Sequence, residues 1–244
     1  MRTRMFRGVA AAVTVSALCF TAAACGGEDE KKPAASGEKS KDKGGEEKPA
    51  EASTTPLTAE QLKAATLEAK DLPAGWTGKT AEADTTKPPT ADKPECQPIA
   101  NMMAGTLPGG TGGPNMEFST KGENDNLSEQ VFTFEGTGAA EFTKAIGTAL
   151  ETCKAAVFTQ DGEKTKVTFA KLSAPKAGEE SHAFTMGMSM EGLGADVKIS
   201  MLVARQGTGV ARAAYVAIDN PKSEAAFGDL VTRMGAKLVK GAQG

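Results

Sequence analysis

The sequence contains few of the side chains that most often carry catalysis or stack on ligands. Its 244 residues include one His, one Trp and one Tyr, and the formal net charge is only -3. A single His excludes any site built from several histidines. Nucleic-acid binding calls for a basic patch or stripe. A charge this close to neutrality therefore gives no reason to expect a nucleic-acid partner.

Long apolar runs are also scarce, and the one present stands at the beginning of the chain. Arg2, Arg4 and Arg7 precede an apolar run from Val9 to Phe20. A positive segment followed by about a dozen apolar residues is typical of a secretory signal. A membrane-spanning helix needs roughly 20 apolar residues, so this run is short for one.

The residues after this run resemble the lipobox of bacterial lipoproteins, in which small residues precede a Cys. Here they are Ala22-Ala23-Ala24-Cys25, with Ala22 where that family usually has Leu. The resemblance implies a signal peptide over residues 1–24 and a diacylglyceryl group on Cys25, which would become the mature N-terminus. Stable membrane anchoring takes two acyl chains rather than one. The same residues also fit an Ala-x-Ala cleavage site, which would leave Cys25 as a free thiol.

A charged, apolar-poor segment follows Cys25. Residues 26–56 contain no aromatic residue and no Leu, Ile, Val or Met, whereas Asp, Glu and Lys are frequent. Such a segment cannot bury enough apolar surface to offset the entropy lost on ordering. We therefore predict a disordered tether over residues 25–56 and an extracytoplasmic domain over residues 57–244.

The four cysteines fall into different roles. Cys19 would leave with the signal peptide and Cys25 would carry lipid, so Cys96 and Cys153 are left as a pair. In an oxidising compartment an even pair predicts a disulfide. Two distant cysteines supply too few ligands for a metal site, and we expect neither a metal nor a cofactor.

Several segments show helical patterns. Thr58 and Gln61 fit a capping box, which predicts a helix that continues past Ala69 and ends at Leu72–Gly75. A short helix is predicted through Ile99–Met103. Two longer helices are predicted over Thr137–Cys153 and after Asn220-Pro221, the latter carrying Phe227 to Leu238. Thr77–Glu95 has no large apolar residue and is predicted to be a loop, and Gly105–Pro114 is predicted to be irregular.

The rest of the domain alternates as strands do. The strand candidates are Met116–Ser119, Gln130–Glu135, Ala156–Gln160, Thr165–Leu172, His182–Glu191, Val197–Gln206 and Val210–Ile218. Turn residues such as Asp161-Gly162 separate several of them. We predict one α+β domain with a central antiparallel sheet of five or six strands, packed by about three helices.

A row of methionines is the most suggestive chemical feature. Met186, Met188 and Met190 alternate along one predicted strand and would point to the same face. Such a row is what a sheet packed against helices requires. Two other interpretations remain open: the row lines an apolar cavity, with Met201 as a further member, or its thioethers bind Cu(I) together with His182.

No catalytic constellation is recognisable. His182 has no Ser or Cys neighbour in an identifiable nucleophile motif, and Gly187–Glu191 departs from the nucleophile elbow because Glu191 stands at the second glycine position. We predict no catalytic residue. A hydrolase that uses a pair of Asp or Glu residues remains a formal alternative, because sequence spacing does not reveal such pairs.

Several short segments together resemble actinobacterial surface lipoproteins with a PknH-like extracellular sensor domain. They are Asp71–Trp76, Cys96, Leu150–Cys153, Lys171–Ser181 and Val203–Gly207. The resemblance implies an α+β domain with a central antiparallel sheet, a cleft for an unidentified ligand, and no catalytic activity. The kinase sensor has two disulfides, whereas this chain can form only one, and the sequence shows no kinase domain.

Together these observations predict a non-enzymatic lipoprotein on the outer face of the cell membrane. It would be a monomer that binds an unidentified envelope ligand or protein. The alternative hypothesis is a carrier of an apolar, lipid-like molecule in a cavity lined by Met186, Met188 and Met190, and a Cu(I)-binding protein is a further one.

Overall fold

The computed structural model describes residues 54–121, 125–190, 195–217 and 221–244, without the side chains of residues 189, 190, 195 and 196. The predicted signal peptide, Cys25 and nearly all of the predicted tether lie outside this part of the chain. No helix within it is long and apolar enough to cross a membrane. The chain divides into two units, Met1–Lys48 and Pro49–Gly244, and all the described residues belong to the second.

The described residues form one antiparallel sheet of nine strands, in the order β1-β3-β4-β9-β8-β7-β6-β5-β2. The strands are β1 (Trp76–Thr80), β2 (Thr90–Ala91), β3 (Gly110–Thr120), β4 (Asp125–Phe134), β5 (Ala155–Gln160), β6 (Glu163–Lys171), β7 (Glu180–Met190), β8 (Ala195–Gln206) and β9 (Gly209–Ala217). The prediction of an α+β domain with an antiparallel sheet is confirmed. The prediction of five or six strands is wrong.

The additional strands come from segments that were predicted to be loops. β1 and β2 lie within or beside Thr77–Glu95 and form the two edges of the sheet. Their side chains are mostly exposed and polar, so no apolar alternation marks them. They are strands because their backbones pair with β3 and β5. These partners are distant in sequence, so the local residue pattern does not reveal the pairing.

β3 also begins earlier than predicted, inside the glycine-rich segment Gly105–Pro114. Gly110 pairs with Phe134 of β4, and a Cβ at Gly110 would lie 2.9 Å from the Phe134 ring. The absence of a side chain at this position lets the aromatic ring lie against the strand. Glycine here permits close packing rather than irregular structure.

Four α-helices pack on this sheet, together with two short 3₁₀ helices. They are α1 (Ala59–Ala65), α2 (Gln97–Asn101), α3 (Gly138–Thr152) and α4 (Ser223–Gln243), with 3₁₀ turns at Ala69–Asp71 and Pro94–Cys96. The Thr58/Gln61 capping box is present. The predicted continuation of this helix past Ala69 is wrong, because the backbone becomes extended at Thr66 and the N–H of Leu67 donates to the buried Glu129 carboxylate at 2.7 Å.

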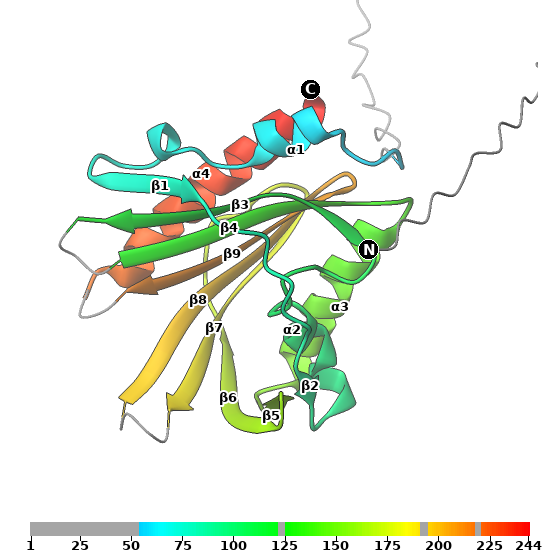
Figure 1. Ribbon diagram of the computed structural model, residues 1–244, viewed down its shortest axis with the longest axis vertical. Coiled ribbons are helices and arrows are strands. Elements are labelled where there is room, and N and C mark those ends of the chain that lie inside the picture. The colour runs from blue at the N-terminus through cyan, green and yellow to red at the C-terminus, as the bar shows by residue number, and fades with distance from the viewer. Residues whose placement is uncertain (1–53, 122–124, 191–194, 218–220) are drawn as a thin grey trace, which may run out of the picture. The chain divides into compact units, whose positions relative to one another are not determined.

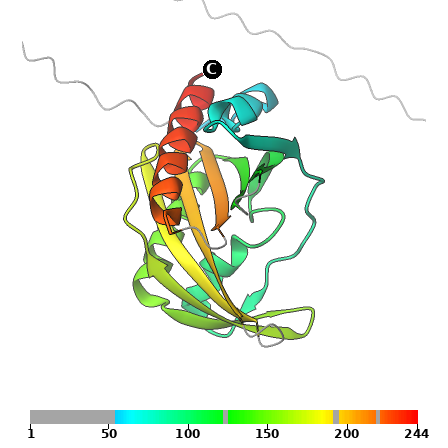
Figure 2. The same ribbon diagram turned by 90° about the vertical axis from the view of Figure 1, so that its left-hand side faces the viewer.

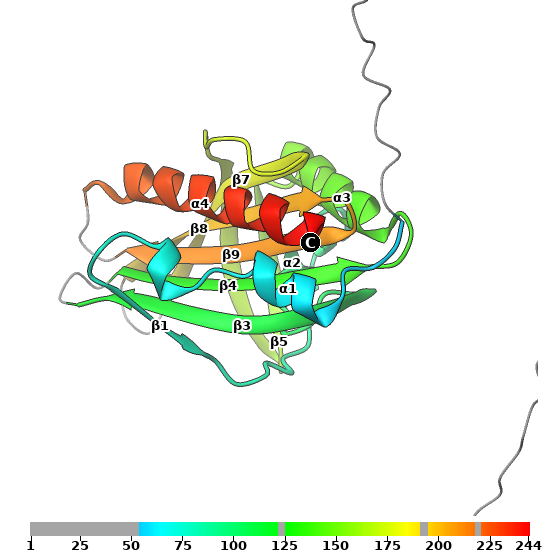
Figure 3. The ribbon, with the colours of Figure 1, turned by 90° about the horizontal axis from the view of Figure 1, so that it is seen from above.

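The helices cover opposite faces of the sheet. Figure 1 shows a strongly bent sheet with α2 and α3 inside the bend, and Figures 2 and 3 show α4 lying along the outer face, with α1 beside it. Each face has its own hydrophobic core: Leu127, Leu230 and Leu238 belong to the outer core, and Phe132 and Ile146 to the inner one.

The predicted disulfide is present. Cys96, at the end of the second 3₁₀ turn, is bonded to Cys153, which follows α3, and their Cα atoms are 5.4 Å apart. Both cysteines are almost completely buried in the inner core. The bond therefore ties α2 to the C-terminal end of α3 and fixes the helical layer inside the bend.

Candidate ligand-binding groove

Strand register arranges the inner face of the sheet in transverse rows. One row runs from Thr77 through Ser119, Asn126, Val216, Ile199 and Met186 to Phe169. The next runs from Lys79 through Glu117, Ser128, Ala214 and Met201 to Phe184. Both rows change from polar side chains on β1, β3 and β4 to apolar side chains on β9, β8 and β7.

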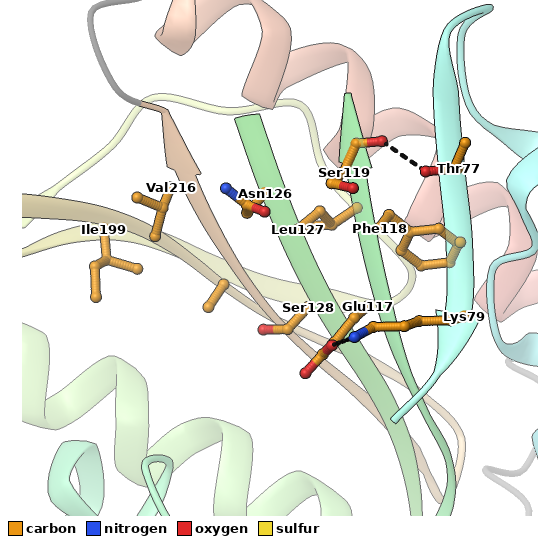
Figure 4. Close-up of a pocket in the computed structure, with 12 residues that line it drawn as sticks. Thr77, Lys79, Glu117, Phe118, Ser119, Asn126, Leu127, Ser128, Ile199 and Val216 are labelled. Atoms are coloured by element: carbon orange, nitrogen blue, oxygen red, sulfur yellow. Dashed lines mark hydrogen bonds and ion pairs between the residues drawn. The ribbon is translucent and has the colours of Figure 1, made fainter. Parts of the chain in front are cut away.

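The polar half of these rows lines a cavity of about 500 Å³. Lys79 Nζ lies 3.0 Å from the Glu117 carboxylate, and Thr77 Oγ1 donates to the Ser119 carbonyl at 3.3 Å. Figure 4 shows these two contacts on one side of the pocket, with Ile199 and Val216 farther along the same face. Hydroxyl, amide and charged groups therefore converge here, with apolar side chains next to them.

The apolar half continues into a second cavity of about 230 Å³. Met186, Met201 and Ile199 line it from the sheet, and Met102 and Met103 line it from the segment after α2. The two cavities share Ser128, Ile199 and Ala214. We call the two adjoining cavities the groove. The larger volume lies within the range of about 300–1,000 Å³ for small-molecule sites, which are mostly apolar with a few placed polar groups, and the smaller volume lies below that range.

One wall of the groove includes the connecting segment, residues 81–89, which joins the edge strands β1 and β2. Asp84 of this segment lines the second cavity, and the Thr86 carbonyl accepts from the N–H of Gly105 at 2.9 Å. A Cβ at Gly105 would lie 2.0 Å from the Asp84 carbonyl oxygen. Only glycine allows this close approach, so Gly105 holds the connecting segment against the groove.

Arg212 of β9 joins the sheet to this wall. Its Nη1 donates to the carbonyls of Met102, at 2.7 Å, and Ala104, and its Nη2 donates to Gln130 Oε1 at 3.2 Å. The guanidinium also lies 5.0 Å from the centre of the Phe132 ring, within cation–π range. Burial lowers the pKa of Arg212 to about 10, and the Asp84 charge opposes this shift. The side chain is therefore still charged at neutral pH.

The structure places the predicted methionines unequally. Met186 is buried and lines the second cavity, as does Met201, whereas Met188 is half-buried against the inner core. The side chain of Met190 lies outside the described residues. His182 is half-buried, with Nε2 3.3 Å from a Glu180 carboxylate oxygen. Whether any of these residues contacts a ligand or Cu(I) stays a prediction.

Sequence reasoning missed most of the groove. Ser128, Asn126 and Arg212 belong to strands whose other face is apolar, and alternation alone assigns such residues to solvent. A charged residue between Ala211 and Ala213 in a strand of small residues was the available signal for Arg212. In the described part of the chain, no three His, Cys, Asp or Glu residues gather as a metal site would require.

Comparisons with known proteins show the fold. No family model and no curated protein matches the chain. The extracellular domain of PknH from Mycobacterium tuberculosis is similar in structure with a TM-score of 0.53 and 16% identity, over 78% of this chain and 99% of that one. An uncharacterized protein from Mycobacterium smegmatis, an Rv0999 ortholog, matches with a TM-score of 0.41 and 12% identity, over 77% and 98% of the two chains. The predicted resemblance to the PknH-like extracellular domain is confirmed at the level of the fold.

Proposed function

We propose that this chain is a membrane-anchored extracytoplasmic lipoprotein whose domain binds a ligand in the groove without transforming it. The observation that carries this proposal is the gradient across the inner face, from Lys79 and Glu117 at one end to Met186 and Met201 at the other. A concave face that offers hydrogen-bonding groups beside apolar side chains is suited to orienting a small molecule.

Ala214 supplies the test because it lines both cavities. The experiment is native mass spectrometry of the full chain carrying Cys25→Ala, secreted by an actinobacterial host so that natural ligands can load. We expect a co-purifying mass in this protein and its loss in the additional variant Ala214→Trp, whose indole fills the centre of the groove.

The matched control is Ala64→Trp, which adds the same indole to an exposed position on α1. It should retain the bound mass. An apo mass for every variant, or equal retention in Ala214→Trp and Ala64→Trp, would contradict binding in the groove.

A carrier of an apolar molecule is the second candidate. Met186 and Met201 support it, because both belong to the buried inner core and also line the smaller cavity. Met side chains adapt their shape to varied ligands. Under this hypothesis the co-purifying mass is lipid-like, and Met201→Glu, which places a carboxylate in the apolar half, removes it.

The anchor requires its own test. Intact-mass analysis of membrane-extracted protein should give a mature chain that begins at Cys25 and carries the added mass of acyl groups. Cys25→Ala should release the protein into the medium. A wild-type chain that begins at Cys25 without acyl mass would show that it is secreted unanchored.

A further inference from the structure

The groove contains a cation, the guanidinium of Arg212, that forms no direct ion pair with a carboxylate of the described residues. The hydrogen-bond acceptors that Arg212 reaches are all neutral: two backbone carbonyls and the side-chain oxygen of Gln130. Among the ion pairs found in the described residues, none includes Arg212. By contrast, Arg205 on the neighbouring strand is paired with Glu179 and Glu180.

Asp84 does not complete the missing pair. The charge of Asp84 raises the pKa of Arg212. However, one of its carboxylate oxygens accepts from the Thr86 N–H at 2.8 Å, and the Asp84 side chain is exposed within the connecting segment. A mostly buried charge without a directly paired counter-ion is costly, and attraction between opposite charges is stronger where water is excluded. The groove therefore favours a ligand that brings a negative charge to Arg212.

The surroundings of Arg212 define the rest of that ligand. Met186, Ile199 and Met201 line the same cavity as the guanidinium. Arg212, Ala214 and Val216 follow one another on the inner face of β9. Arg212 lines the smaller cavity, Val216 lines the larger one, and Ala214 lines both, so the two cavities adjoin at Ala214. An anionic group and an apolar chain in one molecule would match both features.

We propose that the groove binds an anionic amphiphile, with Arg212 holding the carboxylate or phosphate oxygens of its headgroup and Met186, Ile199 and Met201 contacting its acyl chain. This inference rests on the proposed function, namely that the groove binds a ligand, and it specifies the chemical class. The Met102 and Ala104 carbonyls use Nη1, and Gln130 uses one hydrogen of Nη2. The second Nη2 hydrogen and the Nε hydrogen are therefore the two that would donate charge-assisted hydrogen bonds to the anion.

The test compares four probes that share a twelve-carbon chain: dodecanoate, dodecyl phosphate, 1-dodecanol and dodecyltrimethylammonium. Binding to the full chain carrying Cys25→Ala is measured by isothermal titration calorimetry below the micelle concentration of each probe. At least one anion should bind ten-fold or more tightly than the alcohol, and the cation should bind most weakly. Whichever of dodecanoate and dodecyl phosphate binds with the higher affinity shows whether the headgroup is a carboxylate or a phosphate.

Two variants locate the effect. Arg212→Met keeps an unbranched side chain of similar length without the charge and should lose the ten-fold preference for anions while still binding 1-dodecanol. Lys198→Gln removes an exposed cation that does not line the groove and that pairs with Glu224 of α4, and it should retain the preference. Circular dichroism checks that both variants are folded.

Several results would overturn the inference. Equal affinities of the wild type for the anions and the alcohol would do so even if Arg212→Met failed to fold, and so would an undiminished preference in folded Arg212→Met. If no probe bound while native mass spectrometry still found a ligand displaced by Ala214→Trp, the amphiphile assignment would fail and the binding function of the groove would stand.

Discussion

Glu129 of β4 is a carboxyl group in an unusual setting on the outer face of the sheet. It is almost completely buried, and one of its oxygens accepts from the Leu67 N–H at 2.7 Å. Burial raises the pKa of Glu129 to about 8, although the Leu67 hydrogen bond and the charge of Lys237 lower it, and the charge of Asp71 raises it further. Folding therefore favours the protonated form.

This raised pKa predicts that the protein loses stability as the pH rises. Below the ordinary pKa of 4.5, both the folded and the unfolded chain hold the proton, and the Glu129 contribution is fully present. Between that value and about 8 the folded state binds more protons, so its free energy of unfolding falls with pH. Between pH 5 and pH 8 we expect the titration of Glu129 to lower the free energy of unfolding by on the order of 3 kcal/mol.

Urea denaturation of the wild type and of Glu129→Gln at both pH values measures this effect. The amide keeps an acceptor for Leu67 without a titrating proton, so its stability should vary much less with pH. Glu117→Gln, which removes a half-exposed carboxylate from the neighbouring strand, should keep the wild-type slope. A parallel pH dependence of Glu129→Gln and the wild type would show that Glu129 does not control it.

At the scale of elements, the outer layer depends on a close contact between its two helices. A Cβ at Gly241 of α4 would lie 2.3 Å from the Ala65 backbone nitrogen of α1. α1 has only seven residues, which is too short to be stable alone, so this contact and the burial of Leu62 and Ala65 keep it in place.

Gly241→Ala is therefore expected to destabilise the domain by about 1–3 kcal/mol, the usual cost of overpacking. Thermal unfolding gives the value. Gly228→Ala on the same helix is the matched control, because its Cβ would have its nearest neighbour at 3.8 Å. That control should be neutral or more stable than the wild type, since alanine favours helix over glycine by up to about 1 kcal/mol. A Gly241→Ala variant as stable as Gly228→Ala would contradict the close contact.

At the scale of the whole domain, the Cys96–Cys153 bond links the loop-rich N-terminal part to the central helix. The two residues are 57 positions apart. Closing a loop of this length restricts the unfolded chain and stabilises the fold by roughly 4 kcal/mol in the chain-entropy model. The same bond holds α2, and with it the segment of Met102 and Ala104 that accepts from Arg212.

The double variant Cys96→Ala/Cys153→Ala should consequently unfold at a lower urea concentration and bind the groove ligand more weakly. Denaturation and calorimetry measure the two effects separately. The single variant Cys25→Ala, which leaves the bond intact, is the reference for both. An unchanged unfolding midpoint in the double variant would mean that the bond adds no stability.

Features that depend on a local residue pattern could be predicted before the fold was known. Period-2 alternation located β4 to β9 approximately, helical spacing located α3 and α4, and the even pair of cysteines predicted the disulfide. These signals are local because the side chains that point to one core repeat along the chain. The methionine row followed from the same alternation, although its contact with a ligand remains a proposal.

The edges of the sheet and the groove depend on contacts between residues that are far apart in the sequence. β1 and β2 are polar segments that become strands by pairing with distant partners, and α1 ends where a carboxylate 62 residues away takes the Leu67 N–H. Lys79, Ser128 and Met201 come together by register across neighbouring strands. Arg212 lines the second cavity, where it donates to the Met102 carbonyl of the segment after α2. Pairing between distant strands produces no periodic pattern in the sequence. The residues of the groove could therefore be identified only from the strand register in the structure.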